Sequence, residues 1–144
     1  MPVFASCFSY PIDPQRFTNN IHYWDESVPK EESIELYIGQ GLTVTSYNGI
    51  PVDWGKTPVV YLPPGEVVFT LELDFYAINN TTYSGNSIFV WNFKAGDRFW
   101  LVAMLQGMKQ DGKPGIGLMN LDVKQKYEEY DFFPFPESGR RVLE

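Results

Sequence analysis

The sequence has little of the residue chemistry on which many activities depend. Its 144 residues include one cysteine and one histidine, Cys7 and His22. A single cysteine excludes an intrachain disulfide framework and a multi-thiolate zinc site, and a single histidine excludes a multi-histidine metal site. Basic residues are outnumbered 18 to 11 by acidic ones, and the net charge of −7 argues against nucleic-acid binding, because phosphate recognition needs a basic surface. We therefore expect no bound metal or cofactor.

Long apolar runs are missing as well. No stretch approaches the roughly 20 apolar residues that span a bilayer, and the first ten residues lack the basic start and apolar run of a signal peptide. These features predict a cytoplasmic protein without a transmembrane segment. Phe4–Cys7 (FASC) nevertheless resembles a loose bacterial lipobox. Cys7 is thus either a half-buried thiol on a first strand or the lipidated residue of a cell-envelope protein whose leader lies upstream.

Aromatic and β-forming residues are abundant in the chain. It carries 11 Phe, 9 Tyr and 4 Trp residues, with 12 Gly and 11 Pro scattered without a period. Aromatic side chains favour pleated, half-buried surfaces, and a chain of this length can bury a substantial core. Because about eight strands and no convincing helix are expected, we predict an antiparallel two-sheet β-sandwich, Ig-like or prealbumin-like, of about 7–9 strands. A small β-barrel is the alternative.

Turn residues divide residues 34–123 into short segments with strand character. Leu42–Tyr47 alternates strictly between apolar and polar residues. The following Asn48-Gly49 is a strong hairpin signal, because both residues accept a positive φ. The longest alternating segment, Glu66–Ile78, predicts a strand with one dry and one wet face. The other expected strands are Ile34–Ile38, Ile50–Trp54, Pro58–Leu62, Ile88–Phe93, Arg98–Leu105 and Leu118–Val123.

The remaining segments complete one domain over residues 1–144. We expect an irregular N-terminal segment at 11–33, polar loops at 79–86 and 106–117, and an aromatic tail at 124–144 that begins with one or two helical turns. Ile88–Phe93 is apolar on both faces, which predicts a central position in a sheet or cover by a second layer. In the tail, the three rings of Phe132, Phe133 and Phe135 either close an open end of the sandwich or contact a partner protein or a second copy of the chain.

Each motif that suggests catalysis lacks a residue that the chemistry needs. Gly55–Thr57 (GKT) resembles the end of a phosphate-binding loop, but the required earlier glycine is out of register and a strand follows instead of a helix. Glu72 and Asp74 resemble the acids of concanavalin-like glycoside hydrolases, whose second Glu is missing here. A catalytic triad would have to use His22, but the sequence lacks the G-x-S-x-G motif that positions a nucleophilic serine. We therefore expect a protein without enzymatic activity, and an unrecognised hydrolase is the less favoured interpretation.

Aromatic residues beside loops are the remaining binding candidates. Tyr23, Trp24, Tyr47 and Trp54 lie in or beside expected loops, and Tyr76 lies on the wet face of the long strand. Such rings stack on sugars or anchor protein partners, although a chain with 24 aromatic residues must bury most of them. An exposed coplanar row drawn from Trp24, Tyr47, Trp54 and Tyr76 would indicate a carbohydrate-binding module. Burial of these rings, together with the absence of a pocket that holds convergent polar groups, would indicate a structural or protein-binding module.

The succession of turns and strands between residues 44 and 101 resembles a known class of module. It runs through Tyr47–Val52 (YNGIPV), Val59–Leu71 (VVYLPPGEVVFTL) and Phe93–Leu101 (FKAGDRFWL). This layout resembles the PEGA-like and carboxypeptidase-regulatory-like small β-sandwich modules of bacterial envelope proteins. The resemblance implies a mostly non-catalytic module associated with a bacterial envelope. We accordingly expect a non-enzymatic structural or protein-binding module, with a carbohydrate-binding module as the alternative.

Overall fold

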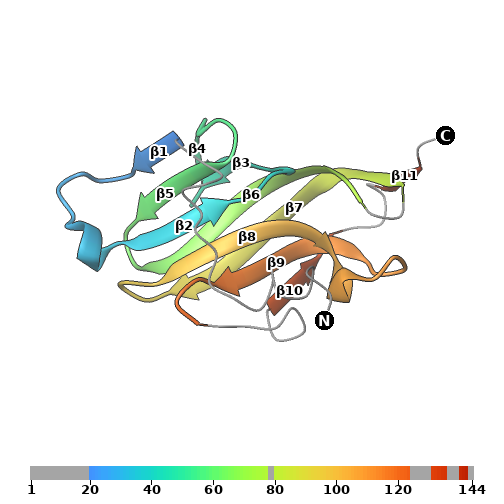
Figure 1. The fold of residues 1–144 in the computed structure, drawn as a ribbon. Coiled ribbons are helices and arrows are strands. Elements are labelled where there is room, and N and C mark those ends of the chain that lie inside the picture. Colours follow the sequence, from blue (N-terminus) through green and yellow to red (C-terminus); the bar gives the residue numbers. More distant parts are fainter. Residues whose placement is uncertain (1–19, 78–79, 124–130, 136–139, 143–144) are drawn as a thin grey trace.

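Two β-sheets pack face to face in this protein (Figure 1). The computed structural model describes residues 20–77, 80–123, 131–135 and 140–142, the last group by backbone only. The six-stranded sheet has the order β1 (Asn20–Tyr23), β5 (Pro58–Leu62), β2 (Ile34–Ile38), β8 (Arg98–Leu105), β9 (Pro114–Asn120), β10 (Asp131–Pro134). The five-stranded sheet has the order β11 (Arg140–Val142), β7 (Thr81–Phe93), β6 (Gly65–Tyr76), β3 (Leu42–Tyr47), β4 (Ile50–Pro51).

This arrangement confirms the predicted all-β sandwich, and the sheets do not close into a barrel. Most neighbouring strands pair antiparallel, but β1 pairs parallel to β5 and β2 pairs parallel to β8. Helical structure in the described part of the chain is limited to two 3-10 turns, Lys30–Glu32 and Gln106–Met108. Within the same ranges, no helix has the length and apolar character needed to cross a membrane.

The core lies between the sheets and follows from the alternation of the strands. On β6, Val67, Phe69, Leu71 and Leu73 are buried, whereas the alternate residues on that strand face outward. The predicted division of this segment into a dry and a wet face is therefore confirmed. Burial of the large apolar side chains in such a core is the main favourable term in folding. The other fully buried large side chains are Phe89, Phe93, Ile34, Leu36, Ile38, Leu62, Leu101, Ile116, Leu118 and Val60.

Several strands differ from their predicted bounds because cross-strand pairing outweighs local composition. The loop predicted at 79–86 is wrong for residues 81–86, which form the first half of β7 and pair with β6. Asn20–Tyr23, placed in an irregular segment, is instead the edge strand β1. The strand β9 begins at Pro114, inside the predicted loop 106–117. Ile50–Trp54 is a strand only over its first two residues.

The sequence predicts Ile88–Phe93 to lie centrally in a sheet or under a second layer, and the other sheet covers one face of this segment only. Phe89 and Phe93 are buried between the sheets. On the opposite face, Ile88 and Val90 keep 67% and 46% of their surface exposed. The apolar residues on one face of this segment therefore belong to the core, and those on the other face form an exposed apolar surface.

The described part of the aromatic tail is a strand of the sandwich. The Phe133 ring lies 5.0 Å from that of Phe89 and 5.7 Å from that of Trp91, and Phe135 is buried in the same core. Phe132, one residue away, packs on the outer face of the six-stranded sheet. Phe133 and Phe135 thus line the β10 edge of the core, Phe132 does not, and contact with a partner stays a prediction. Cys7 and the helical turns expected at 124–130 fall outside the described residues.

Candidate ligand-binding site

A lateral row of side chains crosses four strands on the outer face of the six-stranded sheet. Tyr23 on β1 is in register with Tyr61 on β5, Tyr61 is in register with Glu35 on β2, and Glu35 is in register with Arg98 on β8. Residues opposite each other on neighbouring strands project from the same face of a sheet. The sheet therefore places two tyrosines, a carboxylate and a guanidinium side by side, although these residues come from distant parts of the chain.

Glu35 is the centre of a hydrogen-bond network in this row. Its Oε2 accepts hydrogen bonds from the Tyr37 hydroxyl at 2.5 Å and from Arg98 Nε at 3.1 Å. Arg98 Nη1 in turn donates to Asp122 Oδ1 at 2.9 Å. Charge-assisted hydrogen bonds of this kind are shorter and stronger than neutral ones. The carboxylate and the guanidinium are thus held in fixed positions on the sheet.

The network keeps Glu35 ionised. Burial raises the pKa of this carboxyl, but hydrogen bonds from Tyr37 and Arg98 outweigh burial, so the pKa of Glu35 lies below its ordinary value. Burial and the neighbouring Glu35 carboxylate raise the pKa of Tyr37, and burial is also the first cause of the raised pKa of Tyr61. At neutral pH the site therefore presents a carboxylate whose neighbouring phenols are protonated donors.

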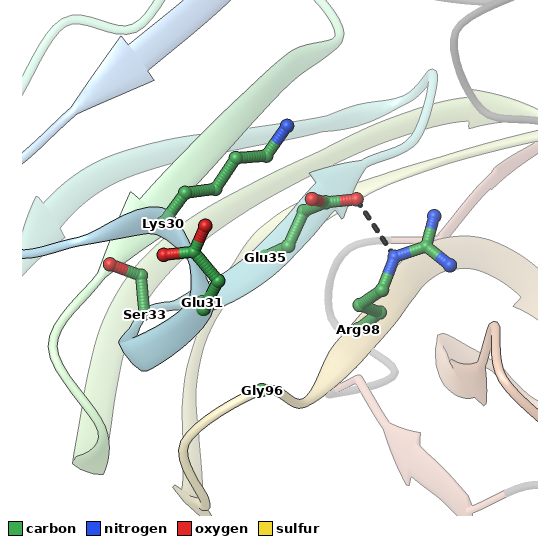
Figure 2. Close-up of a pocket in the computed structure, with 6 residues that line it drawn as sticks. All are labelled: Lys30, Glu31, Ser33, Glu35, Gly96 and Arg98. Atoms are coloured by element: carbon green, nitrogen blue, oxygen red, sulfur yellow. Dashed lines mark hydrogen bonds and ion pairs between the residues drawn. The ribbon is translucent and has the colours of Figure 1, made fainter.

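A shallow hollow of about 380 Å³ opens beside this network. Its lining residues come from the first 3-10 turn, from β2 and from the turn that leads into β8. Figure 2 shows Glu35 lying between Lys30 on the 3-10 turn and Arg98 on β8. Gly96 N donates to Ser33 O at 3.1 Å, which ties the two walls of the hollow together. The lining is Lys30, Glu31, Ser33, Glu35, Gly96 and Arg98.

Two stacked tyrosines lie beside Lys30, one of the residues that line the hollow. The rings of Tyr23 and Tyr61 lie 4.7 Å apart and within 10° of parallel. Tyr61 is buried, whereas Tyr23 keeps 47% of its surface exposed. Lys30 Nζ lies 5.2 Å from the centre of the Tyr61 ring, and its interaction with Tyr61 raises the pKa of the ammonium. The exposed ring is therefore backed by a rigid one and stands beside a cation.

The five aromatic residues singled out in the sequence separate into three groups. Tyr23 lies in this site, and Trp24 follows it, donating its backbone N–H to Tyr61 O at 3.0 Å. Tyr47 and Trp54 are core residues, 5% and 8% exposed. Tyr76 is 60% exposed on the other sheet, where its hydroxyl donates to Asn80 Oδ1 at 2.6 Å. A coplanar exposed row of Trp24, Tyr47, Trp54 and Tyr76 is therefore not formed.

The candidate acids and bases of the sequence do not gather into a second centre among the described residues. Glu72 and Asp74 are exposed on the outer face of β6. His22 Nε2 lies 2.9 Å from Trp54 O and 2.9 Å from Asn20 Oδ1, so this ring fastens β1 to the loop before β5. Within the residues that the structure describes, no three His, Cys, Asp or Glu side chains lie close enough together to hold a metal ion.

Sequence reasoning missed the three residues that define the row with Tyr23. All three lie in segments that are typical of buried strands, and only two of these segments contain a charged residue as a local signal, Glu35 in one and Arg98 in the other. Glu35 stands between Ile34 and Leu36, and a charge inside an apolar strand rarely stays buried unless it has a partner. That rule marks Glu35 as a candidate but does not identify Arg98 as its partner.

Comparisons with protein-family models, with curated proteins and with solved structures find no match to this chain. The function of the site must therefore be argued from the residues that form it.

An ionised carboxylate such as Glu35, which already accepts two hydrogen bonds, is a poor proton donor at neutral pH. A fixed polar cluster next to an exposed ring is instead an arrangement that suits recognition.

Proposed function

We propose that this protein is a non-enzymatic β-sandwich module that binds a carbohydrate on the outer face of its six-stranded sheet. The observation that carries the proposal is the exposed Tyr23 ring, stacked on Tyr61, whose ring in turn contacts Lys30 in the lining of a charged hollow. A pyranose ring has an apolar C–H face and a polar edge. An aromatic ring next to fixed donors and acceptors matches both.

The platform is rigid before any ligand binds. Tyr61 supports one face of Tyr23, and the backbone of Trp24 is hydrogen-bonded to β5. A side chain that is already ordered loses little conformational entropy on binding, which favours affinity. Lys30 and Glu31, at the edge of the same hollow, supply a donor and an acceptor within the reach of sugar hydroxyls.

The electrostatics of Glu35 support binding over hydrolysis. A glycosidase needs one carboxylic acid whose raised pKa keeps it protonated at working pH. The pKa of Glu35 is lowered, and its carboxylate is engaged by Tyr37 and Arg98. The resemblance of residues 44–101 to PEGA-like modules agrees with a non-catalytic role. A protein-binding role is the second candidate, favoured by the exposed apolar residues Ile88 and Val90 on the other sheet.

A glycan panel tests the carbohydrate proposal. The Trp24 ring packs edge-on against the buried Tyr47 ring, so calorimetry is the primary measurement of binding and tryptophan fluorescence accompanies it. Tyr23→Ala should weaken binding by about tenfold or more, the loss of a hot-spot aromatic contact of at least about 1.4 kcal/mol. Tyr76→Ala removes a tyrosine of the other sheet that is more exposed than Tyr23, and it should leave the affinity unchanged.

Two results would contradict the proposal. One is a panel of neutral and acidic glycans that produces no change in fluorescence and no heat in calorimetry. The other is a glycan whose affinity is the same for wild type and Tyr23→Ala while circular dichroism shows both proteins folded, because the sugar would then bind elsewhere.

A further inference from the structure

A second surface stands out on the opposite side of the molecule. On β7, Ile88 and Val90 point away from the core and are largely exposed. On β6, Thr70 lies opposite Ile88 and Val68 lies opposite Val90. We call these four residues the β6–β7 patch. Single exposed apolar residues on a protein are normal, but a contiguous apolar group framed by polar residues is typical of an interaction site.

The patch lies on a regular part of the sheet. β6 and β7 pair from Gly65–Phe93 to Tyr76–Thr82 without a shift in register. The Asn48 side chain accepts a hydrogen bond from Val68 N at 2.7 Å and donates one to Glu66 O at 3.3 Å, which fixes one end. The patch is therefore a continuous, preformed surface.

The rim of the patch is acidic. Glu66 on one side, and Glu72 and Asp74 on the other, flank the patch residues on the outward face of β6 and are exposed, and Asn86 and Asn92 flank the patch on β7. None of the described outward-facing side chains on β3, β6 and β7 is Lys or Arg, and the two arginines of β11, Arg140 and Arg141, pair with the start of β7 at Tyr83 and Thr82. In the part of the chain that the structure describes, these three carboxylates take part in no ion pair.

This combination points to the chemistry of the partner. We propose that the β6–β7 patch binds another protein, whose contact surface has an apolar centre surrounded by Lys or Arg side chains. Complementary potentials favour such a partner and speed its association. A second copy fits poorly, because a face-to-face pair would bring like carboxylates together, and each chain carries a net charge of −7.

Synthetic peptides provide the probe. Three matched sets are compared by fluorescence anisotropy: a central Val-Ile-Val flanked by lysines, the same centre flanked by glutamates, and lysine-flanked peptides with a serine centre. We expect the first set to bind at least tenfold more tightly than either control set. Raising the salt concentration should weaken this binding, because ions screen exposed charges.

Variants locate the binding on the patch. The double substitution Ile88→Ser and Val90→Thr should lower the affinity for the lysine-flanked apolar peptides by tenfold or more. Glu72→Gln should make the binding of these peptides less dependent on salt. Ile21→Ser removes a similarly exposed isoleucine from the other sheet and serves as the matched control, with no change expected. Thermal unfolding verifies that each variant is folded.

The inference would be overturned if the three peptide sets bound equally, or if the Ile88 and Val90 substitutions left binding intact. It would also be overturned by sedimentation data showing a dimer of wild type that the same substitutions dissociate, because the occupant would then be a second copy. The patch and the tyrosine site lie on different sheets, so failure of the glycan test does not affect this one.

Discussion

The hydrogen bonds of Glu35 give a graded prediction for two substitutions. Glu35→Gln keeps an acceptor for the Tyr37 hydroxyl and removes the charge opposite Arg98. The Arg98 side chain is 41% exposed, so solvent screens this pair and its loss should cost about 1 kcal/mol. Glu35→Ala also leaves the buried Tyr37 hydroxyl without its acceptor, which costs about 1–3 kcal/mol more. The free energy of unfolding at pH 7 should therefore fall by about 1 kcal/mol for Gln and about 2–4 kcal/mol for Ala.

The pH dependence of the Glu35→Gln effect follows from the lowered pKa. A carboxyl whose folded pKa lies below its unfolded pKa stabilises the folded state above the unfolded value, and this contribution is lost as the pH falls through the folded value. For Glu35 the ordinary value is 4.5 and the folded value is lower. The stability difference between wild type and Glu35→Gln should thus be constant at neutral pH and shrink below pH 4.5.

Urea unfolding followed by tryptophan fluorescence between pH 7 and pH 3.5 measures both effects. Glu66→Gln is the matched control, because Glu66 is exposed on β6 and forms no ion pair with any described residue. The reasoning is refuted if Glu35→Ala is no more destabilising than Glu35→Gln. It is also refuted if the gap between wild type and Glu35→Gln persists unchanged at the lowest pH.

Three further substitutions test the core and the turns by the same unfolding measurement. Phe69 is fully buried against the rings of Trp54 and Phe89, so Phe69→Ala should cost about 3–5 kcal/mol, and a loss below about 1 kcal/mol would contradict this packing. Gly41 and Gly49 both have positive φ, but a Cβ at Gly41 would lie 2.7 Å from Phe75 Cβ, whereas none of the atoms around Gly49 is within 4 Å. Gly49→Ala should therefore cost roughly 1 kcal/mol from backbone strain and Gly41→Ala clearly more, and equal losses would count against the steric argument.

Local patterns predicted the strands that turn residues bracket. Leu42–Tyr47 is a strand with the predicted bounds, and Asn48 and Gly49 adopt the positive φ angles that the hairpin signal requires. The first half of β7 escaped prediction because its residues, apart from Tyr83, are polar and small. This half of β7 is a strand because it pairs with β6, and the outward face of β6 is polar there as well. The segment itself shows no alternation of apolar and polar residues from which a strand could be predicted.

The site was less predictable than the fold. Tyr23 and Trp24 were found because they are aromatic residues beside an irregular segment. The row that Tyr23 forms with Tyr61, Glu35 and Arg98 depends on two parallel pairings, β1 with β5 and β2 with β8. Those pairings are set by the order of strands in the whole sheet, which hydrophobic periodicity within one segment does not encode.

The same topology has a consequence for how the protein reaches its binding-competent state. β7 begins at Thr81, soon after β6 ends at Tyr76, so this pair closes a short loop. The contact between Glu35 and Arg98 spans 63 positions. Closing longer loops costs more chain entropy, and long-range contacts form more slowly. The tyrosine site is thus complete only when the most distant strands have joined, and ligand binding there reports on the finished fold.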